Sequence, residues 1–479
     1  MKKLFILFSV LSVLYVPAYT FELKPELSPA ANEYVLVVNS YDWGPAADKI
    51  IINTGRTFIA EAVKTDEFAV DITVPLSKKD EDSYGVVKGH RTITAAYLCD
   101  EHGSKTAEKG PYISLELSVR PDDSSCNPFK SIPVIQEKDK AYDLRIKNKT
   151  LDLLITKCTG LQSMPAALFH LGQFNSKEIT MSYACWEPES HAEGTPLIVW
   201  LHGISGGGQD PYVPILDAKA VSLISPQIQQ YFTNGASVLI PQCPSGWFET
   251  TTKGAFGMHV WEPVDVNGTV EKITKPVSAF LGKVFSFAKS DKKETQPDAA
   301  VSYYTGALKE LIDSYTALRP YIDKKRIYIA GYSAGGYMVM NMCIQYPGYF
   351  AAAVPVCEAY LNSKITNDQI EFLAKQPFWF VYAKNDGTIK PEANSIPTIT
   401  RLHNAGAENL HSSVFDDVHD TSGLYKIESD DDDDDDEKES KEKLPFQYPG
   451  HFSWTYVLND QCRENDVSLF TWLAEQHLP

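Results

Sequence analysis

The alternation of apolar and polar residues divides the chain into two parts that predict different folds. In residues 24–155, short runs alternate between apolar and polar positions with a period of two, and turn residues separate the runs. This period is typical of strands that bury one face of a sheet. We therefore expect this part to form a small antiparallel β-sandwich. The runs that predict strands begin at Glu33, Asp48, Glu67, Arg91 and Tyr112.

Residues 165–479 follow a different pattern. Their apolar runs are nearly continuous instead of alternating, as in 196–201 and 377–383. Continuous apolar strands are expected in a parallel sheet that is covered on both faces. Stretches with apolar residues three and four positions apart lie between these runs and predict helices. This part is therefore predicted to be an α/β domain with a doubly wound, mostly parallel sheet.

One serine lies at the centre of a strand, turn and helix pattern that runs from Arg326 to Met338. The turn contains Gly331, Ser333 and Gly335, with the spacing G-x-S-x-G. A sharp turn from strand to helix leaves little room for side chains two residues before and after the serine, and glycine meets that demand. This pattern is the nucleophile elbow of α/β-hydrolases, so Ser333 is the predicted nucleophile.

A serine hydroxyl becomes a good nucleophile only beside a base that a third group holds in place. In α/β-hydrolases the acid and the base follow the serine along the chain. Asp386 lies in a turn just past the apolar run 378–382, and it is the preferred acid because this run is the second predicted strand after the nucleophile. Glu358, which follows the preceding predicted strand, is the second candidate.

Two histidines compete for the role of base. His451 precedes the last helical stretch of the chain, where a C-terminal catalytic histidine is expected. His419 lies in a polar turn between two aspartates and is the less favoured choice. We interpret a third histidine, His202, as ordering the glycine-rich loop 203–208 and not as transferring protons.

The tetrahedral intermediate of acyl transfer needs N–H donors for its oxyanion, and each donor is worth about 3 kcal/mol in catalysis. The backbone amide of Ala334, directly after the nucleophile, is one predicted donor. The amide of Ile204, in the loop after the apolar run 196–201, is the other. We predict no cofactor, because the triad and the backbone donors supply the chemistry. We also expect no structural zinc site, since the cysteines include no C-x-x-C pair.

The N-terminus predicts secretion. Two lysines precede an apolar run from Leu4 to Val16, and small residues follow it, so residues 1–18 are interpreted as a cleaved signal peptide. The run is shorter than the roughly 20 residues that span a bilayer, and we expect no membrane association after cleavage. An oxidising compartment permits disulfide bonds, and the even number of eight cysteines fits them, although buried free thiols are an open alternative.

The acidic residues are concentrated in one place. The formal net charge is −18, and residues 428–443 contain eleven acidic residues against three lysines. This balance argues against a nucleic-acid partner. The acidic run lacks the glycine and the ligand spacing of a calcium loop, so we interpret it as a solvated insertion.

Several motifs of the chain resemble the EstA-type secreted esterases. The segment that begins at Tyr34 and the run Tyr41-Asp-Trp-Gly-Pro resemble the immunoglobulin-like N-terminal domain of that family. The Leu201-His-Gly, Cys357-Glu-Ala-Tyr and Gly450-His-Phe-Ser-Trp motifs, together with the elbow, resemble its hydrolase domain. The likeness covers nearly all of the mature chain. The acidic insertion departs from the family pattern because it lengthens the loop that carries His451.

The resemblance implies an extracellular carboxylesterase with Ser333, Asp386 and His451 as its triad. Its substrate would be a small-molecule ester or an ester linked to a polysaccharide. One alternative is a prolyl oligopeptidase-like peptidase that uses the same triad. A second alternative is a non-catalytic binding protein on a hydrolase scaffold, which would normally have lost a triad member. The sequence leaves the oligomeric state open, a homo-oligomer included.

Overall fold

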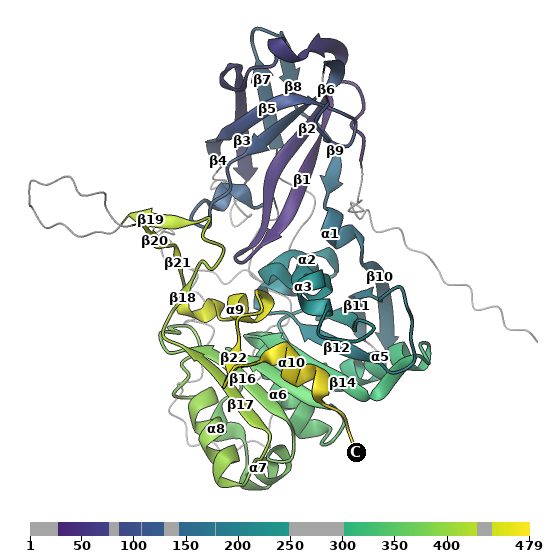
Figure 1. Ribbon diagram of the computed structural model, residues 1–479, viewed down its shortest axis with the longest axis vertical. Coiled ribbons are helices and arrows are strands. Elements are labelled where there is room, and N and C mark those ends of the chain that lie inside the picture. Colours follow the sequence, from purple (N-terminus) through teal and green to yellow (C-terminus); the bar gives the residue numbers. More distant parts are fainter. Residues whose placement is uncertain are drawn as a thin grey trace, which may run out of the picture.

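The computed structural model describes residues 27–75, 86–106, 108–128, 143–177, 179–248, 301–428 and 443–479 (Figure 1). The predicted signal peptide, residues 1–18, lies outside the described residues. Residues 429–442 of the predicted acidic insertion lie outside them as well. Among the described residues, no helix has the length and apolar character needed to cross a bilayer.

The N-terminal part consists of two β-sheets, as the alternating pattern predicted. One sheet has the strand order β5-β6-β2-β1-β9 and the other the order β4-β3-β7-β8. The pairs within the predicted bounds are antiparallel, and β9, which follows those bounds, adds one parallel pair with β1. The strands are β1 (Glu33–Tyr41), β2 (Gly44–Ile59), β3 (Phe68–Pro75), β4 (Val86–Arg91), β5 (Ile93–Cys99), β6 (Lys109–Leu117), β7 (Asp143–Asn148), β8 (Leu153–Ile155) and β9 (Lys157–Gln162).

The C-terminal part contains an eight-stranded sheet with the order β10-β11-β13-β12-β14-β15-β16-β17. The pairs β10–β11 and β11–β13 are antiparallel and the other pairs are parallel, which confirms the predicted mostly parallel sheet. Every residue of β12, β13, β15 and β16 is buried, and this burial explains their continuous apolar runs. The strands are β10 (His170–Ser176), β11 (Ile179–Trp186), β12 (Thr195–Leu201), β13 (Ser237–Gln242), β14 (Ile322–Tyr332), β15 (Ala352–Val356), β16 (Phe378–Ala383) and β17 (Leu410–Phe415).

Helices cover both faces of this sheet. Alternate residues of β12 enter different cores, with Trp200 in one cluster and Val199 in the other. Helices α5, α6 and α7 pack in the Val199 cluster, and α2, α3, α9 and α10 pack in the Trp200 cluster. The helices are α1 (Met164–Ala167), α2 (Tyr212–Leu216), α3 (Pro226–Gln229), α5 (Thr305–Ala317), α6 (Ala334–Gln345), α7 (Asn367–Leu373), α8 (Ser395–Asn404), α9 (Trp454–Leu458) and α10 (Leu469–Glu475).

The two parts of the molecule share one hydrophobic core. The cluster that contains Trp200 and α9 continues into the N-terminal sandwich, where it includes Tyr34, Leu36 and Val38 of β1. Figure 1 shows the hairpin of β1 and β2 extending from the sandwich toward α2 and α9. The sandwich therefore packs against one covered face of the eight-stranded sheet.

The cysteines differ from expectation. All eight lie in described residues, and none of them forms a disulfide bond there, so the predicted disulfide bonds are absent. Two of the thiols lie near carbonyl oxygens. The thiol of Cys126 lies 3.7 Å from the carbonyl oxygen of Ser118, and the thiol of Cys158 lies 3.4 Å from that of Gly160. Seven of the cysteines are buried, and they behave as small core residues.

Candidate active site

The predicted nucleophile lies in a sharp turn between β14 and α6. Ser333 has backbone angles of φ 56° and ψ −116°, which a residue with a side chain adopts only when its surroundings enforce them. A Cβ atom on Gly331 would lie 2.8 Å from the Cβ of Leu201, and one on Gly335 would lie 2.1 Å from the carbonyl oxygen of Leu201. The glycines of the motif are therefore required because the end of β12 passes directly beside the turn.

Three side chains from separate loops form a hydrogen-bonded chain at the carboxyl ends of the strands. The Oγ of Ser333 lies 2.9 Å from Nε2 of His451, and Nδ1 of His451 lies 2.8 Å from Oδ2 of Asp386. Asp386 follows β16, and His451 lies in the short helix η7 (Gly450–Phe452). All three residues are buried. The structure thus brings together the three residues that the sequence singled out, and their catalytic roles stay predictions.

The carboxylate of Asp386 is held on both of its oxygens. Oδ1 accepts hydrogen bonds from the backbone N–H groups of Thr388, at 2.8 Å, and Ile389, at 2.9 Å. Oδ2 is left to accept a hydrogen bond from the imidazole of His451. A carboxylate only accepts hydrogen bonds, so we place the ring proton on Nδ1, which leaves Nε2 free to accept from the Ser333 hydroxyl. This arrangement has the polarity that a general base needs.

The groups around His451 have opposite effects on the pKa of its ring. Burial disfavours the charged ring, whereas the Cys357 sulfur and the Asp386 carboxylate favour it, and together they raise the pKa of His451 from 6.5 to about 10. Cys357 directly follows β15. The sequence analysis missed this residue as part of the site, although its position at a strand end beside Glu358 was a usable signal.

The two predicted oxyanion donors both lie at the start of a helix. Ala334 is the first residue of α6, and Ile204 is the first residue of the short helix η4 (Ile204–Gly206). The first amides of a helix have no acceptor within that helix. Their N–H groups are therefore available to an oxyanion, as the proposed role requires, and that role stays a prediction.

His202 fixes the loop that carries Ile204. The backbone N–H of Cys243 donates to Nε2 of His202 at 2.9 Å, so the ring proton is on Nδ1, which donates to the carbonyl oxygen of Gly203 at 2.5 Å. Burial lowers the pKa of His202 to about 4, and the ring is neutral. The Gly203 carbonyl and the Ile204 N–H belong to one planar trans peptide and point in opposite directions. By holding the carbonyl, His202 sets the direction of the N–H.

Asp217 links the oxyanion loop to the elbow. Its Oδ2 accepts hydrogen bonds from the Ser205 hydroxyl and from the Tyr332 hydroxyl, both at 2.7 Å. Ser205 follows Ile204 in the chain, and Tyr332 precedes Ser333. Asp217 therefore ties together the two segments that carry the predicted donors. No periodic pattern marks this residue, because it lies at the start of the irregular segment η5 (Asp217–Ile224).

Two family profiles match the sequence. The family described as the esterase Ig-like N-terminal domain matches residues 33–157. The prolyl oligopeptidase family matches residues 307–410, a segment that contains Ser333 and Asp386 and ends before His451. A search of curated proteins found no match.

A solved structure titled as a thermostable esterase has the same architecture. It is 20% identical to this chain, with a TM-score of 0.61, and the alignment covers 93% of this chain and 99% of that chain. The protein has an α/β-hydrolase fold that follows an Ig-like N-terminal domain. A ferulic acid esterase aligns at 14% identity over 53% of this chain and 91% of its own, with a TM-score of 0.34. The acylaminoacyl peptidase of Pyrococcus horikoshii aligns at 14% identity over 52% of this chain and 36% of its own, with a TM-score of 0.31.

The alternative site residues of the hydrolase domain have other partners. The ring of His419 lies 2.9 Å from Asp417 and 3.2 Å from the hydroxyl of Tyr456. The Glu358 carboxyl accepts hydrogen bonds from the backbone N–H of Tyr360 at 2.6 Å and from the Ser395 hydroxyl at 3.3 Å. Burial raises the pKa of Glu358 well above its usual value. Of the two candidate histidine rings, that of His451 is the one that lies within hydrogen-bond distance of the Ser333 hydroxyl, at 2.9 Å.

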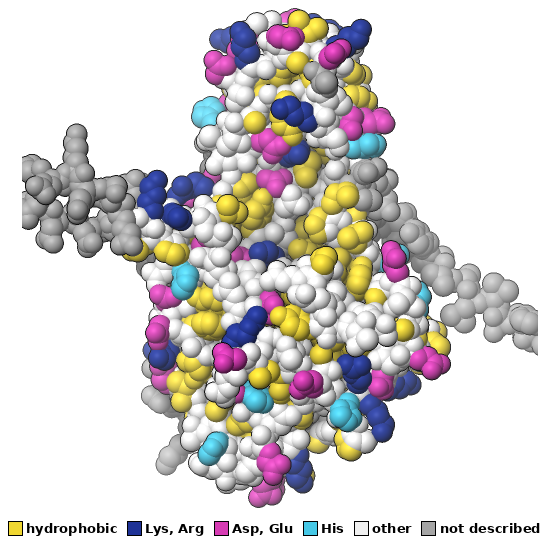
Figure 2. All heavy atoms as spheres, viewed as in Figure 1, with side chains coloured by type: hydrophobic (Ala, Val, Ile, Leu, Met, Phe, Trp, Pro, Cys, Tyr) yellow, Lys and Arg dark blue, Asp and Glu magenta, His cyan; other side chains and the backbone are white. Residues whose placement is uncertain are grey.

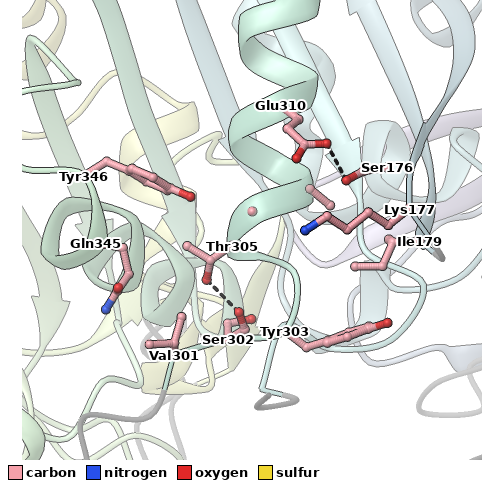
Figure 3. Close-up of a pocket in the computed structure, with 12 residues that line it drawn as sticks. Ser176, Lys177, Ile179, Val301, Ser302, Tyr303, Thr305, Glu310, Gln345 and Tyr346 are labelled. Atoms are coloured by element: carbon pink, nitrogen blue, oxygen red, sulfur yellow. Dashed lines mark hydrogen bonds between the residues drawn. The ribbon is translucent and has the colours of Figure 1, made fainter.

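A cavity of about 480 Å³ lies at the other end of α6. Gln345 ends this helix and lines the cavity, whereas Ser333 precedes its first residue, and a helix of 12 residues is about 18 Å long. Figure 3 shows the hydrogen bond from the Ser176 hydroxyl to Glu310 of α5 at the cavity wall, with Lys177 beside these two residues. The cavity is therefore separate from the Ser333 site. Among the described residues, no group of three His, Cys, Asp or Glu side chains is arranged to hold a metal ion.

Proposed function

We propose that the protein is a secreted serine hydrolase that cleaves carboxylic esters. The observation that carries this proposal is the buried hydrogen-bonded chain from Asp386 through His451 to Ser333 at the carboxyl ends of the parallel strands. Hydrolases of this fold place their nucleophile, acid and base at these positions. The match of the N-terminal domain to an esterase family favours an ester over a peptide as substrate.

In the proposed reaction, the Oγ of Ser333 attacks the ester carbonyl while Nε2 of His451 takes the hydroxyl proton. Asp386 holds the imidazole and stabilises its positive charge. The amides of Ala334 and Ile204 bind the oxyanion. His451 then gives its proton to the leaving alcohol, which leaves an acyl-enzyme, and water attacks that acyl group by the reverse sequence of proton transfers.

The compartment and the substrate class are further parts of the proposal. Residues 1–18 would direct the chain to secretion, with 24–155 as the Ig-like domain and 165–479 as the hydrolase domain. The substrate would be a short-chain ester or an acyl ester on a polysaccharide. In Figure 2, the Lys and Arg side chains of the described residues are scattered among Asp and Glu on the visible face, which does not favour a polyanionic partner.

A peptidase is the second candidate, and the match of residues 307–410 to the prolyl oligopeptidase family favours it. Both candidates would use the same triad, so the two differ in substrate alone. Proline-containing peptides and aryl esters distinguish them directly.

The test is a panel of aryl esters graded by acyl length, beside acetylated and feruloylated glycans and proline-containing peptides. We expect ester hydrolysis with a preference for short acyl chains, and loss of that activity in Ser333→Ala. Cleavage of peptides without ester preference would favour the peptidase. Full ester hydrolysis by Ser333→Ala would overturn the proposed mechanism.

A further inference from the structure

The turn between β1 and β2 of the Ig-like domain is inserted against the hydrolase domain. Tyr41 and Gly44 form the last pair of the hairpin, so Asp42 and Trp43 form its two-residue turn. Asp42 is only 5% exposed, which is unusual for a charged residue at the tip of a hairpin. The hydroxyl of Ser40 also donates to the carbonyl oxygen of Leu216 in α2, at 2.5 Å.

Asp42 contacts both ends of α9. Its carbonyl oxygen accepts a hydrogen bond from the indole N–H of Trp454, the first residue of that helix, at 3.1 Å. Its carboxylate accepts from the amide of Asn459, the residue after the helix, at 3.1 and 3.2 Å. Lys219 completes the cluster, with Nζ 3.1 Å from Asp42 Oδ1 and 2.7 Å from Asn459 Oδ1. Asp42 of the Ig-like domain thus forms hydrogen bonds at both ends of α9.

Helix α9 contacts the predicted base, His451, through the side chain of Trp454. The rings of Trp454 and His451 meet edge to face, with centroids 5.7 Å apart. Trp454 also packs on Tyr332, the residue before the nucleophile, at 4.6 Å, and on Phe452 at 4.4 Å. The imidazole therefore has a hydrogen-bonded restraint from Asp386 on one side and a packing restraint from Trp454 on another.

We infer that Asp42 is a positioning residue for His451: by holding α9 at both ends, it keeps the imidazole in hydrogen-bond reach of Ser333. The inference rests on the proposed function. Small displacements of a catalytic group cost rate and not substrate affinity, because they act on the geometry of the transition state. Loss of the Asp42 carboxylate removes the acceptor that Lys219 and Asn459 share, which loosens the C-terminal end of the helix. Asn459 keeps its contacts with Lys219, at 2.7 Å, and with Thr421, at 3.3 Å.

The experiment compares Asp42→Ala with a matched control, Asp48→Ala. Asp48 belongs to the same hairpin but bonds within the Ig-like domain, to Asn39 at 2.7 Å and Tyr41 at 2.8 Å. The readouts are kcat and KM for an aryl acetate, the rate of labelling by a fluorophosphonate, and the thermal unfolding midpoint. We expect Asp42→Ala to lower kcat and the labelling rate about tenfold, with KM changed less than about twofold. Asp48→Ala should retain both rates.

Asp42→Asn is the second variant, because its side-chain oxygen still accepts from Asn459 while the charge is lost. It should recover part of the lost rate and keep the inference testable if the alanine variant unfolds. Equal rates in the Asp42 and Asp48 variants, at equal folded fraction, would overturn the inference. Failure of the proposed function has a different signature, since the unaltered protein would then neither hydrolyse esters nor react with the fluorophosphonate.

Discussion

Among its described residues, the hydrolase domain contains two histidine–aspartate pairs of almost equal length, and one of them reaches the serine. Nδ1 of His451 lies 2.8 Å from Asp386, and Nδ1 of His419 lies 2.9 Å from Asp417. The side chains of the first pair are 5% and 0% exposed, whereas both side chains of the second pair are 44% exposed. The distance alone therefore does not distinguish the two pairs. Burial and the contact of His451 with Ser333 do.

Local structure explains the different exposure. His419 lies in the short strand β18 (Val418–His419), where Val418 is fully buried. Successive side chains of a strand point to opposite sides, so His419 faces outward. His451 lies in η7, next to Gly450, whose Cβ position would clash with Asn385 at 2.1 Å. The close contact with the loop of Asp386 is possible only with glycine there, and it turns His451 inward.

The largest effect should separate the two histidines. His451→Ala should lower kcat/KM for an aryl acetate on the order of 10⁴- to 10⁶-fold, because the serine loses its base. His419→Ala should stay within about twofold, since its exposed pair contributes little. Steady-state kinetics on both variants measure this difference. Loss of activity in the second variant alone would reverse the assignment of the base.

The two aspartates should differ in the same way. Asp386→Asn should lower kcat about 10⁴-fold, since an amide that donates to the ring would favour the wrong tautomer. Asp417→Asn is the matched control and should change kcat less than about twofold. Comparable kcat values for these two variants would contradict a specific role for the buried pair.

The pH dependence of kcat/KM should reflect the contact between Asp386 and His451. Asp386 and Cys357 outweigh the effect of burial and raise the pKa of His451 above 6.5. The base must be neutral, so kcat/KM should rise with pH along a limb whose midpoint lies above pH 6.5. In Asp386→Asn the anion is gone, and the limb of the residual activity should move to lower pH. If the midpoint of this limb were the same in Asp386→Asn as in the unaltered protein, Asp386 would not contact the base whose titration the limb reports.

A smaller effect should distinguish Asp386 from the other buried acid. The pKa of Glu358 is raised well above 4.5 in the folded state, so its contribution to stability is present below the unfolded pKa and is lost as the pH rises toward the folded pKa. Glu358→Gln should remove this loss and keep kcat within about threefold. Urea unfolding of the unaltered protein and of Glu358→Gln between pH 4.5 and pH 8 measures this change in the free energy of unfolding. A kcat loss as large as that of Asp386→Asn would make Glu358 part of the site.

The sequence predicted the fold well where each signal was local. Gly331 and Gly335 mark the elbow because the steric demand falls on residues next to Ser333. The apolar runs of the parallel strands mark the sheet because both of its faces are buried. These features depend on neighbours in the chain, and a single sequence displays them.

Features set by distant contacts were not predictable. The bond between Trp454 and Asp42 joins residues 412 positions apart, and no periodicity of the chain signals it. The same is true of the parallel pairing of β1 with β9. The disulfide prediction was wrong because the count of cysteines says nothing about their positions in the fold. The order of the serine, acid and base candidates can be read along the chain. The distances between their side chains depend on the tertiary fold.

The most direct test of the central claim is covalent labelling of the full chain by a fluorophosphonate, followed by peptide mass mapping. The account predicts one adduct, on the peptide that contains Ser333, and no adduct in Ser333→Ala. A label on a different residue, or equal labelling of Ser333→Ala, would contradict it.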